Sequence, residues 1–166
     1  RPMANPYFNA HYAALFEAIC GPIFPQGRQG LKGMLRHLSK GGMLMMLNDL
    51  YVGSGQEMEF VDKPAMTSTN AAEMALRYNA ALLPVYGIRN PDGISFDVVI
   101  EDEIPHTDAE TMTLAFNASI SARIRAHPGQ WFWIHRRWKR KWRKGKGVST
   151  DEPMPAAIQP RRKYKG

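Results

Sequence analysis

The chain has few of the residues and motifs that mark several large classes of protein. Its 166 residues include one cysteine, Cys20, which excludes an internal disulfide and a zinc site built from several cysteines. We expect that thiol to be buried and inert. The longest apolar runs, residues 43–47 and 80–88, are far shorter than the ~20 residues that a membrane-spanning helix needs.

Signatures of several enzyme classes are also missing. No Gly-Lys-Ser or Gly-Lys-Thr follows the glycines near residue 30, so a phosphate-binding loop is not supported. No Gly-x-Ser-x-Gly elbow of a serine hydrolase occurs. The five histidines show no pair at i and i+4, so we expect no metal and no other cofactor. The chain begins with Arg1 and shows no signal-peptide pattern, so we expect it to be a piece of a longer protein.

What is present indicates one globular domain. The composition is 44% hydrophobic and 22% charged. The apolar residues are numerous enough to form a core, which excludes a disordered chain. A length of 166 residues suits a single domain. We expect a folded unit at residues 1–143 and a basic, disordered tail at residues 144–166.

Positive charge is concentrated at one end of the chain. Residues 1–134 carry 10 Lys and Arg against 13 Asp and Glu, net −3, whereas residues 135–166 carry 12 against 2, net +10. Such a segment suits a polyanionic partner. Anionic membrane is our first expectation, a solvated end the second, and a nucleic acid the last.

Tryptophan favours the membrane interpretation. If residues 131–146 form a helix, Ile134, Trp138 and Trp142 fall four apart on one face and cations fill the rest. Tryptophan is enriched at membrane interfaces, and each cation near an anionic leaflet contributes about 1 kcal/mol before screening. The expected headgroup contacts are Trp138, Trp142, His135, Arg136, Arg137, Lys139 and Arg140.

Apolar spacing predicts four helices, over residues 6–18, 27–40, 70–79 and 107–126. The last is expected to begin with a capping box of Thr107 and Glu110. Residues 51–63 lack a period and are predicted to be a loop. Residues 81–89 and 94–101 flank an Asn-Pro-Asp-Gly turn, which predicts a β-hairpin whose buried face carries Ile94, Phe96, Val98 and Ile100.

The apolar run at residues 43–47 lies between a glycine pair and Asn48-Asp49, which predicts a buried strand in a sheet flanked by helices. The fold class expected is therefore α/β. In such sheets ligands bind at the carboxyl ends of the strands, so Asp49 is a candidate functional residue. The alternative is that Asp49 only stabilises a turn.

Together these segments resemble the late acyltransferases of lipid A biosynthesis, the lauroyl and myristoyl transferase family. The resemblance covers about residues 1 to 139. Its features are Arg-Pro-x-x-Asn-Pro at the start, Gly-Leu-Lys-Gly-Met-Leu at residues 30–35, Asn48-Asp49, Leu-Pro-Val at residues 83–85 and, most specifically, Pro-Gly-Gln-Trp-Phe-Trp-Ile-His-Arg-Arg-Trp-Lys at residues 128–139.

The resemblance implies transfer of a fatty acyl chain from acyl carrier protein to a hydroxyl of a lipid A precursor or related glycolipid. It implies a place on the cytoplasmic face of the bacterial inner membrane, in lipopolysaccharide biosynthesis. It also implies a fold similar to the glycerol-phosphate acyltransferases, here incomplete at the N-terminus. The other reading is a non-catalytic, basic, tryptophan-rich module that binds anionic membrane or RNA.

The family's catalysis uses a histidine followed five positions later by Asp or Glu, and this chain has no such pair. The resemblance implies that the pair lies upstream and that this chain alone is inactive. It assigns substrate-binding or supporting roles to Arg1, in the Arg-Pro segment, and to Asp49, after the central strand. Leu50 follows Asp49 where the family often has Gln or His.

Overall fold

The computed structural model describes residues 4–25 and 27–139. Their helices and strands are, in chain order, α1 (Pro6–Cys20), α2 (Arg28–Ser39), β1 (Gln56–Phe60), β2 (Lys63–Thr67), α3 (Asn70–Tyr78), β3 (Val85–Arg89), β4 (Phe96–Ile100), α4 (Ala109–Ala126) and the 3-10 helix η1 (Pro128–Gln130). The strands form two antiparallel hairpins, β1–β2 and β3–β4. The expected mixture of helices and strands is confirmed, and all four predicted helices are present within a few residues of their expected ends. Arg1 and residues 140–166, with the expected tail, lie outside the described residues.

The helix ends follow from local chemistry. The Asn5 side chain accepts hydrogen bonds from the backbone N–H groups of Tyr7 and Phe8 and so caps α1. Helix α4 is capped by Asp108, whose Oδ1 accepts from Glu110 and Thr111. The predicted capping box of Thr107 and Glu110 is therefore wrong by one residue, because an aspartate directly before the helix supplies the acceptor.

The predicted loop at residues 51–63 is also wrong, since it contains β1 and the turn into β2. In β1, Met58 and Phe60 are buried while Gln56, Glu57 and Glu59 are exposed, which is the alternation of a strand covered on one face. The turn has positive φ at both central residues, Val61 (48°) and Asp62 (61°). Hairpin turns of this kind usually contain glycine or asparagine. The Val-Asp sequence therefore gave no turn signal.

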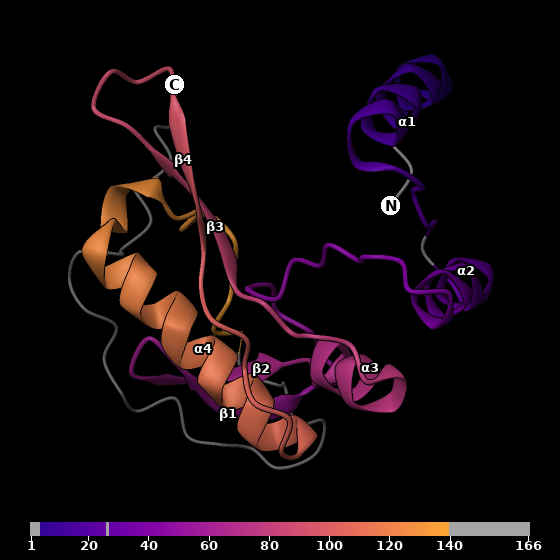
Figure 1. Ribbon diagram of the computed structural model, residues 1–166. Helices are drawn as coiled ribbons and strands as arrows, with labels where there is room; N and C mark the ends of the chain where they lie inside the picture. The colour runs from indigo at the N-terminus through magenta and orange to yellow at the C-terminus, as the bar shows by residue number, and fades with distance from the viewer. Residues whose placement is uncertain (1–3, 26, 140–166) are drawn as a thin grey trace, which may run out of the picture.

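The core lies where α4 meets both hairpins and α3 (Figure 1). One cluster joins Phe60 and Ala65 to Ile120 and Ile124 of α4. A second cluster joins Ala72, Ala75, Ile104 and Met112. Phe116 packs against both clusters, so the two form a continuous apolar interior.

The β3–β4 hairpin turns the opposite face inward from the one predicted. Ile94, Phe96, Val98 and Ile100 are exposed, with relative exposures from 55% to 85%. The inward face carries Tyr86, whose hydroxyl is 2.6 Å from Ser119 Oγ on α4. Glu101, just after β4, accepts from Arg123 Nε at 2.7 Å. These polar contacts with α4 decide which face of the hairpin is covered.

Residues 43–47 do not form the predicted buried strand. They run extended and make no strand pairing with any described residue. Met43, Met45 and Leu47 are exposed at 87%, 80% and 75%, while Leu44 and Met46 between them are half-buried. The prediction failed because a strand needs a neighbouring strand, and none of the described strands lies in register with this run.

Helices α1 and α2 lie to one side of the core, joined to it by the extended run (Figure 1). Helix α2 packs against α3, whereas α1 buries none of its residues. Cys20, at the end of α1, is exposed, so the expectation of a buried thiol is wrong. Among the helices of residues 4–25 and 27–139, none is both long and apolar enough to span a bilayer.

Candidate functional site

Asp49 lies in a bend directly after the extended run and is held by a residue far along the chain. The indole Nε1 of Trp131 donates a hydrogen bond to Asp49 Oδ2 at 3.0 Å. Two residues further along, the backbone N–H of Tyr51 donates to His135 Nε2 at 2.8 Å. His135 Nε2 is therefore the acceptor in this bond. The bend is thus fastened to the segment 131–135 at two points.

Arg137 lies two residues after His135 in the same segment. It is fully buried, and its guanidinium donates to Met66 O at 2.6 Å and to Thr67 Oγ1 at 2.7 Å. Its Cζ lies 4.4 Å from the centre of the Phe60 ring, a cation–π contact. Its Nε has no hydrogen-bond partner among the described residues.

Charge links Arg137 to Asp49. Burial lowers the pKa of the Arg137 guanidinium, because the interior disfavours its charged form, and the negative charge of Asp49 opposes that change. An arginine keeps its proton at neutral pH even so. The cluster therefore contains a permanent buried cation, and the neighbouring carboxylate partly balances its charge.

Aromatic rings close the cluster. Trp131 and Trp138 pack against Phe60 with ring centres 5.8 Å and 6.0 Å from it, and lie 5.7 Å from each other. The indole N–H of Trp138 donates to Phe60 O at 3.2 Å. We call the group of Asp49, Trp131, His135, Arg137 and Trp138 the Asp49 cluster.

The structure brings some predicted site residues together and separates others. Asp49, His135, Arg137 and Trp138 meet in the Asp49 cluster, whereas Arg136 and Lys139 are exposed. The guanidinium of Arg137 is enclosed by protein, so in this structure it does not reach a lipid headgroup. Arg1, Arg140 and Trp142 lie outside the described residues.

The predicted helix with Ile134 and Trp138 on one face is wrong over residues 131–139, which form turns. Ile134 is 82% exposed, while Trp138 packs on Phe60. Sequence reasoning also missed the partnership of Trp131 with Asp49. Its only signal was the resemblance, which named both segments without pairing them.

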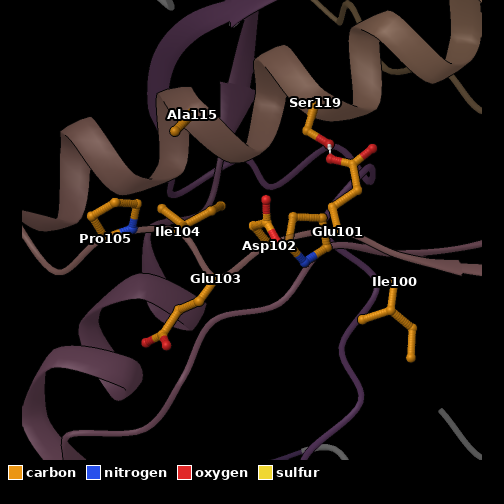
Figure 2. Close-up of a pocket in the computed structure, with 9 residues that line it drawn as sticks. Ile100, Glu101, Asp102, Glu103, Ile104, Pro105, Ala115 and Ser119 are labelled. Carbon is orange, nitrogen blue, oxygen red and sulfur yellow. Dashed lines mark hydrogen bonds between the residues drawn. The ribbon is translucent and has the colours of Figure 1, made fainter.

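A groove of about 480 Å³ lies between α4 and the segment after β4. Figure 2 shows Glu101 and Ser119 meeting across it, while Glu103 points away from α4. The hydrogen bond from Ser119, followed by those from Arg123, lowers the pKa of Glu101. This carboxylate therefore serves to hold β4 on α4. Within residues 4–25 and 27–139, no group of three His, Cys, Asp or Glu side chains could hold a metal ion.

A second groove, of about 440 Å³, lies between α2 and α3. It is lined mostly by apolar side chains: Phe24, Leu31, Met34, Leu35, Met46 and Met74. Met46 precedes Asp49 by three residues, about 10 Å along an extended chain. Asn70, Glu73 and Arg77 of α3 add polar groups to the lining, and the volume lies within the range of small-molecule pockets.

Comparison with known proteins agrees with these features. The sequence profile of the family described as "Bacterial lipid A biosynthesis acyltransferase" matches residues 1–140. The lipid A biosynthesis lauroyltransferase of Escherichia coli (strain K12) is 31% identical to the chain over 118 residues. That alignment covers 68% of this chain and 39% of the lauroyltransferase.

Proposed function

The chain belongs to the bacterial lipid A biosynthesis acyltransferase family, and from that premise we propose that it takes part in transferring a fatty acyl chain from acyl carrier protein to a hydroxyl of a lipid A precursor or related glycolipid. The observation that carries the proposal beyond the family is the Asp49 cluster. It joins the bend at Asp49 to residues 131–138 by direct hydrogen bonds from Trp131 to Asp49 and from Tyr51 to His135.

In the proposed reaction an imidazole base takes the proton of the acceptor hydroxyl. The oxygen attacks the thioester carbonyl, the C–S bond breaks, and the protonated imidazole returns its proton to the carrier's sulfur, which leaves as a thiol. The base and its acidic partner would come from a part of the protein outside these 166 residues, since none of the five histidines has an acid five positions later. The chain alone would then be inactive.

Asp49 would support that base or contact the substrate, and its fixed position suits either role. Trp131 holds Oδ2, so the carboxylate does not need to be ordered when substrate binds. The apolar groove between α2 and α3 offers a place for the acyl chain near Asp49. A fold similar to the glycerol-phosphate acyltransferases and a role for Arg1 in binding substrate remain parts of the proposal.

We further propose that the protein works at the cytoplasmic face of the bacterial inner membrane, where a glycolipid acceptor would be presented. Support comes from charge. Arg136 and Lys139 are exposed, and residues 135–166 have a net charge of +10. An anionic leaflet attracts such a segment.

The test is an acyl-transfer assay with acylated carrier protein and a lipid A precursor, read by mass spectrometry of the glycolipid. The complete gene product should add one acyl chain, and the 166-residue chain alone should add none. If the complete product binds anionic vesicles or RNA but never acylates the glycolipid, the non-catalytic module is the better account.

A further inference from the structure

We propose that Phe132, Trp133 and Ile134 form a tip that inserts into an anionic lipid surface and brings the Asp49 cluster to that surface. The meaning of this contact rests on the proposed function, but the contact itself does not depend on catalysis. The residues differ from those that the sequence suggested, because Trp138 and Arg137 face the interior.

The tip is apolar and open to solvent. Phe132 is 64% exposed, Trp133 51% and Ile134 82%. Three consecutive large apolar side chains in water are unfavourable, because each would gain about 1.5–3 kcal/mol if it were fully buried. A partner that covers them therefore has free energy to gain.

The tip is also held in place from both sides. Trp131 before it is tied to Asp49, and Arg137 after it is buried on β2. Within it, Trp133 Nε1 donates to Pro128 O at 2.6 Å, and the Trp133 ring lies 4.7 Å from that of Trp131, edge to face. Insertion would consequently cost little ordering of the backbone, since the turn is already formed.

Positively charged residues follow the tip in the sequence. Arg136 and Lys139 are exposed directly after it, and the sequence contains no Asp or Glu from residue 131 to residue 150. An apolar tip with a tryptophan and flanking cations matches the lipid interface, where indoles lie at headgroup depth and cations meet anionic phosphates. Charge complementarity thus favours anionic lipid over a neutral surface.

The position of the tip favours lipid over a nucleic acid or a second copy of this chain. Phe132 is adjacent to Trp131, which contacts Asp49. An acceptor that resides in a membrane must reach the Asp49 cluster, and a tip one residue away places the cluster at membrane depth. Stacking on nucleic acid bases would not use Ile134, the most exposed of the three side chains.

The test is flotation of the full chain with vesicles of phosphatidylcholine, with and without phosphatidylglycerol. The tip variant carries Phe132→Ser and Ile134→Ser. The matched control carries Ile94→Ser and Val98→Ser, two apolar residues on the β3–β4 hairpin that are exposed at 85% and 69%. The tip variant should lose partitioning into anionic vesicles by about tenfold or more, whereas the control should bind like the wild type.

Replacing Arg136 and Lys139 by Gln should weaken binding to anionic vesicles and reduce the dependence of that binding on salt.

Tryptophan fluorescence provides a second readout. Quenching by lipids brominated on their acyl chains should fall in Trp133→Phe, because that indole would enter the bilayer. The proposal is overturned if the tip variant and the control bind equally, if RNA displaces the wild type while the vesicles do not bind it, or if the tip variant instead loses a dimer in sedimentation. Vesicle binding needs no substrate, so tip insertion without any acyl transfer would contradict the proposed function alone.

Discussion

The indole N–H of Trp131 and the carboxylate of Asp49 are joined by a 3.0 Å hydrogen bond across 82 residues of sequence. The bend at Asp49 follows a run of residues that pairs with no described strand, so regular sheet structure does not fix it. Tertiary contacts from residues 131–137 fix it instead. Trp131 and His135 are therefore points at which the position of the Asp49 bend can be altered.

Replacing Trp131 by Phe tests that bond. Trp131→Phe keeps most of the ring packing on Phe60 but removes the donor, and the free energy of unfolding should fall by about 1 kcal/mol. In a double-mutant cycle with Asp49→Ala, the two changes should couple by at least about 0.5 kcal/mol. Urea unfolding measures both. Additive effects would mean that the bond does not hold the bend.

Arg137 and Arg136 form a matched pair of neighbours. Arg137→Met should destabilise the protein by about 2–4 kcal/mol, because Met66 O and Thr67 Oγ1 lose their buried donors. Arg136→Met should change stability by less than about 0.5 kcal/mol, because Arg136 is exposed. Chemical denaturation compares the two, and equal effects would show that the burial of Arg137 has been misassigned.

Gly55, directly before β1, and Gly87, in β3, offer a packing test. A Cβ on Gly55 would lie 2.1 Å from Thr67 O, so Gly55→Ala should displace β2 and lower the melting temperature. A Cβ on Gly87 of β3 meets nothing within 4 Å, so Gly87→Ala should stabilise slightly, by about 0.5 kcal/mol. Calorimetry measures the melting temperature of each variant and so gives the direction of both changes. A Gly55→Ala protein that melts like the wild type would contradict the close approach of residue 55 to β2.

The pH dependence of the free energy of unfolding should show how much the Glu101 carboxylate contributes to stability. The Ser119 hydrogen bond lowers the pKa of Glu101 in the folded state below its usual value of about 4.3. Its contribution is therefore fully present above about pH 4.3 and is lost as the pH falls through the lower, folded-state pKa. Glu101→Gln should destabilise the protein at neutral pH, and the difference from the wild type should shrink in acid.

Glu57→Gln, on the exposed face of β1, is the control and should leave the acid limb of the stability curve in place. The measurement is unfolding free energy by denaturant at a series of pH values. A Glu101→Gln effect that stays constant into acid would show that packing, not the charge of Glu101, stabilises this contact.

Local patterns in the sequence were sufficient for the helices and for the β3–β4 turn. Apolar residues three and four apart define α2, α3 and α4, and Asn-Pro-Asp-Gly defines the turn, because these signals act within a few residues. The β1–β2 hairpin was not predicted, because Val61 and Asp62 have positive φ in its turn and the pair is not a usual signal for that turn.

Contacts between distant segments could not be read from periodicity. The inward face of β3–β4 is chosen by Tyr86 and Glu101 meeting Ser119 and Arg123, and no alternation of apolar residues encodes that choice. In the same way, the run of basic residues predicted a headgroup contact for Arg137, but its guanidinium donates to Met66 O and Thr67 Oγ1 instead. Asp49 was predicted as a functional residue from its place after the apolar run and from the family resemblance, and its partners came from the structure.

The most direct test of the central claim is the rate of acyl transfer by the complete gene product with Asp49→Asn, measured with acylated carrier protein and a lipid A precursor. We expect the rate to fall by about a hundredfold while circular dichroism and vesicle binding stay as in the wild type, because the substitution removes only the negative charge of one side chain. An Asp49→Asn enzyme that transfers acyl chains at the wild-type rate would contradict the assignment of the Asp49 cluster to catalysis.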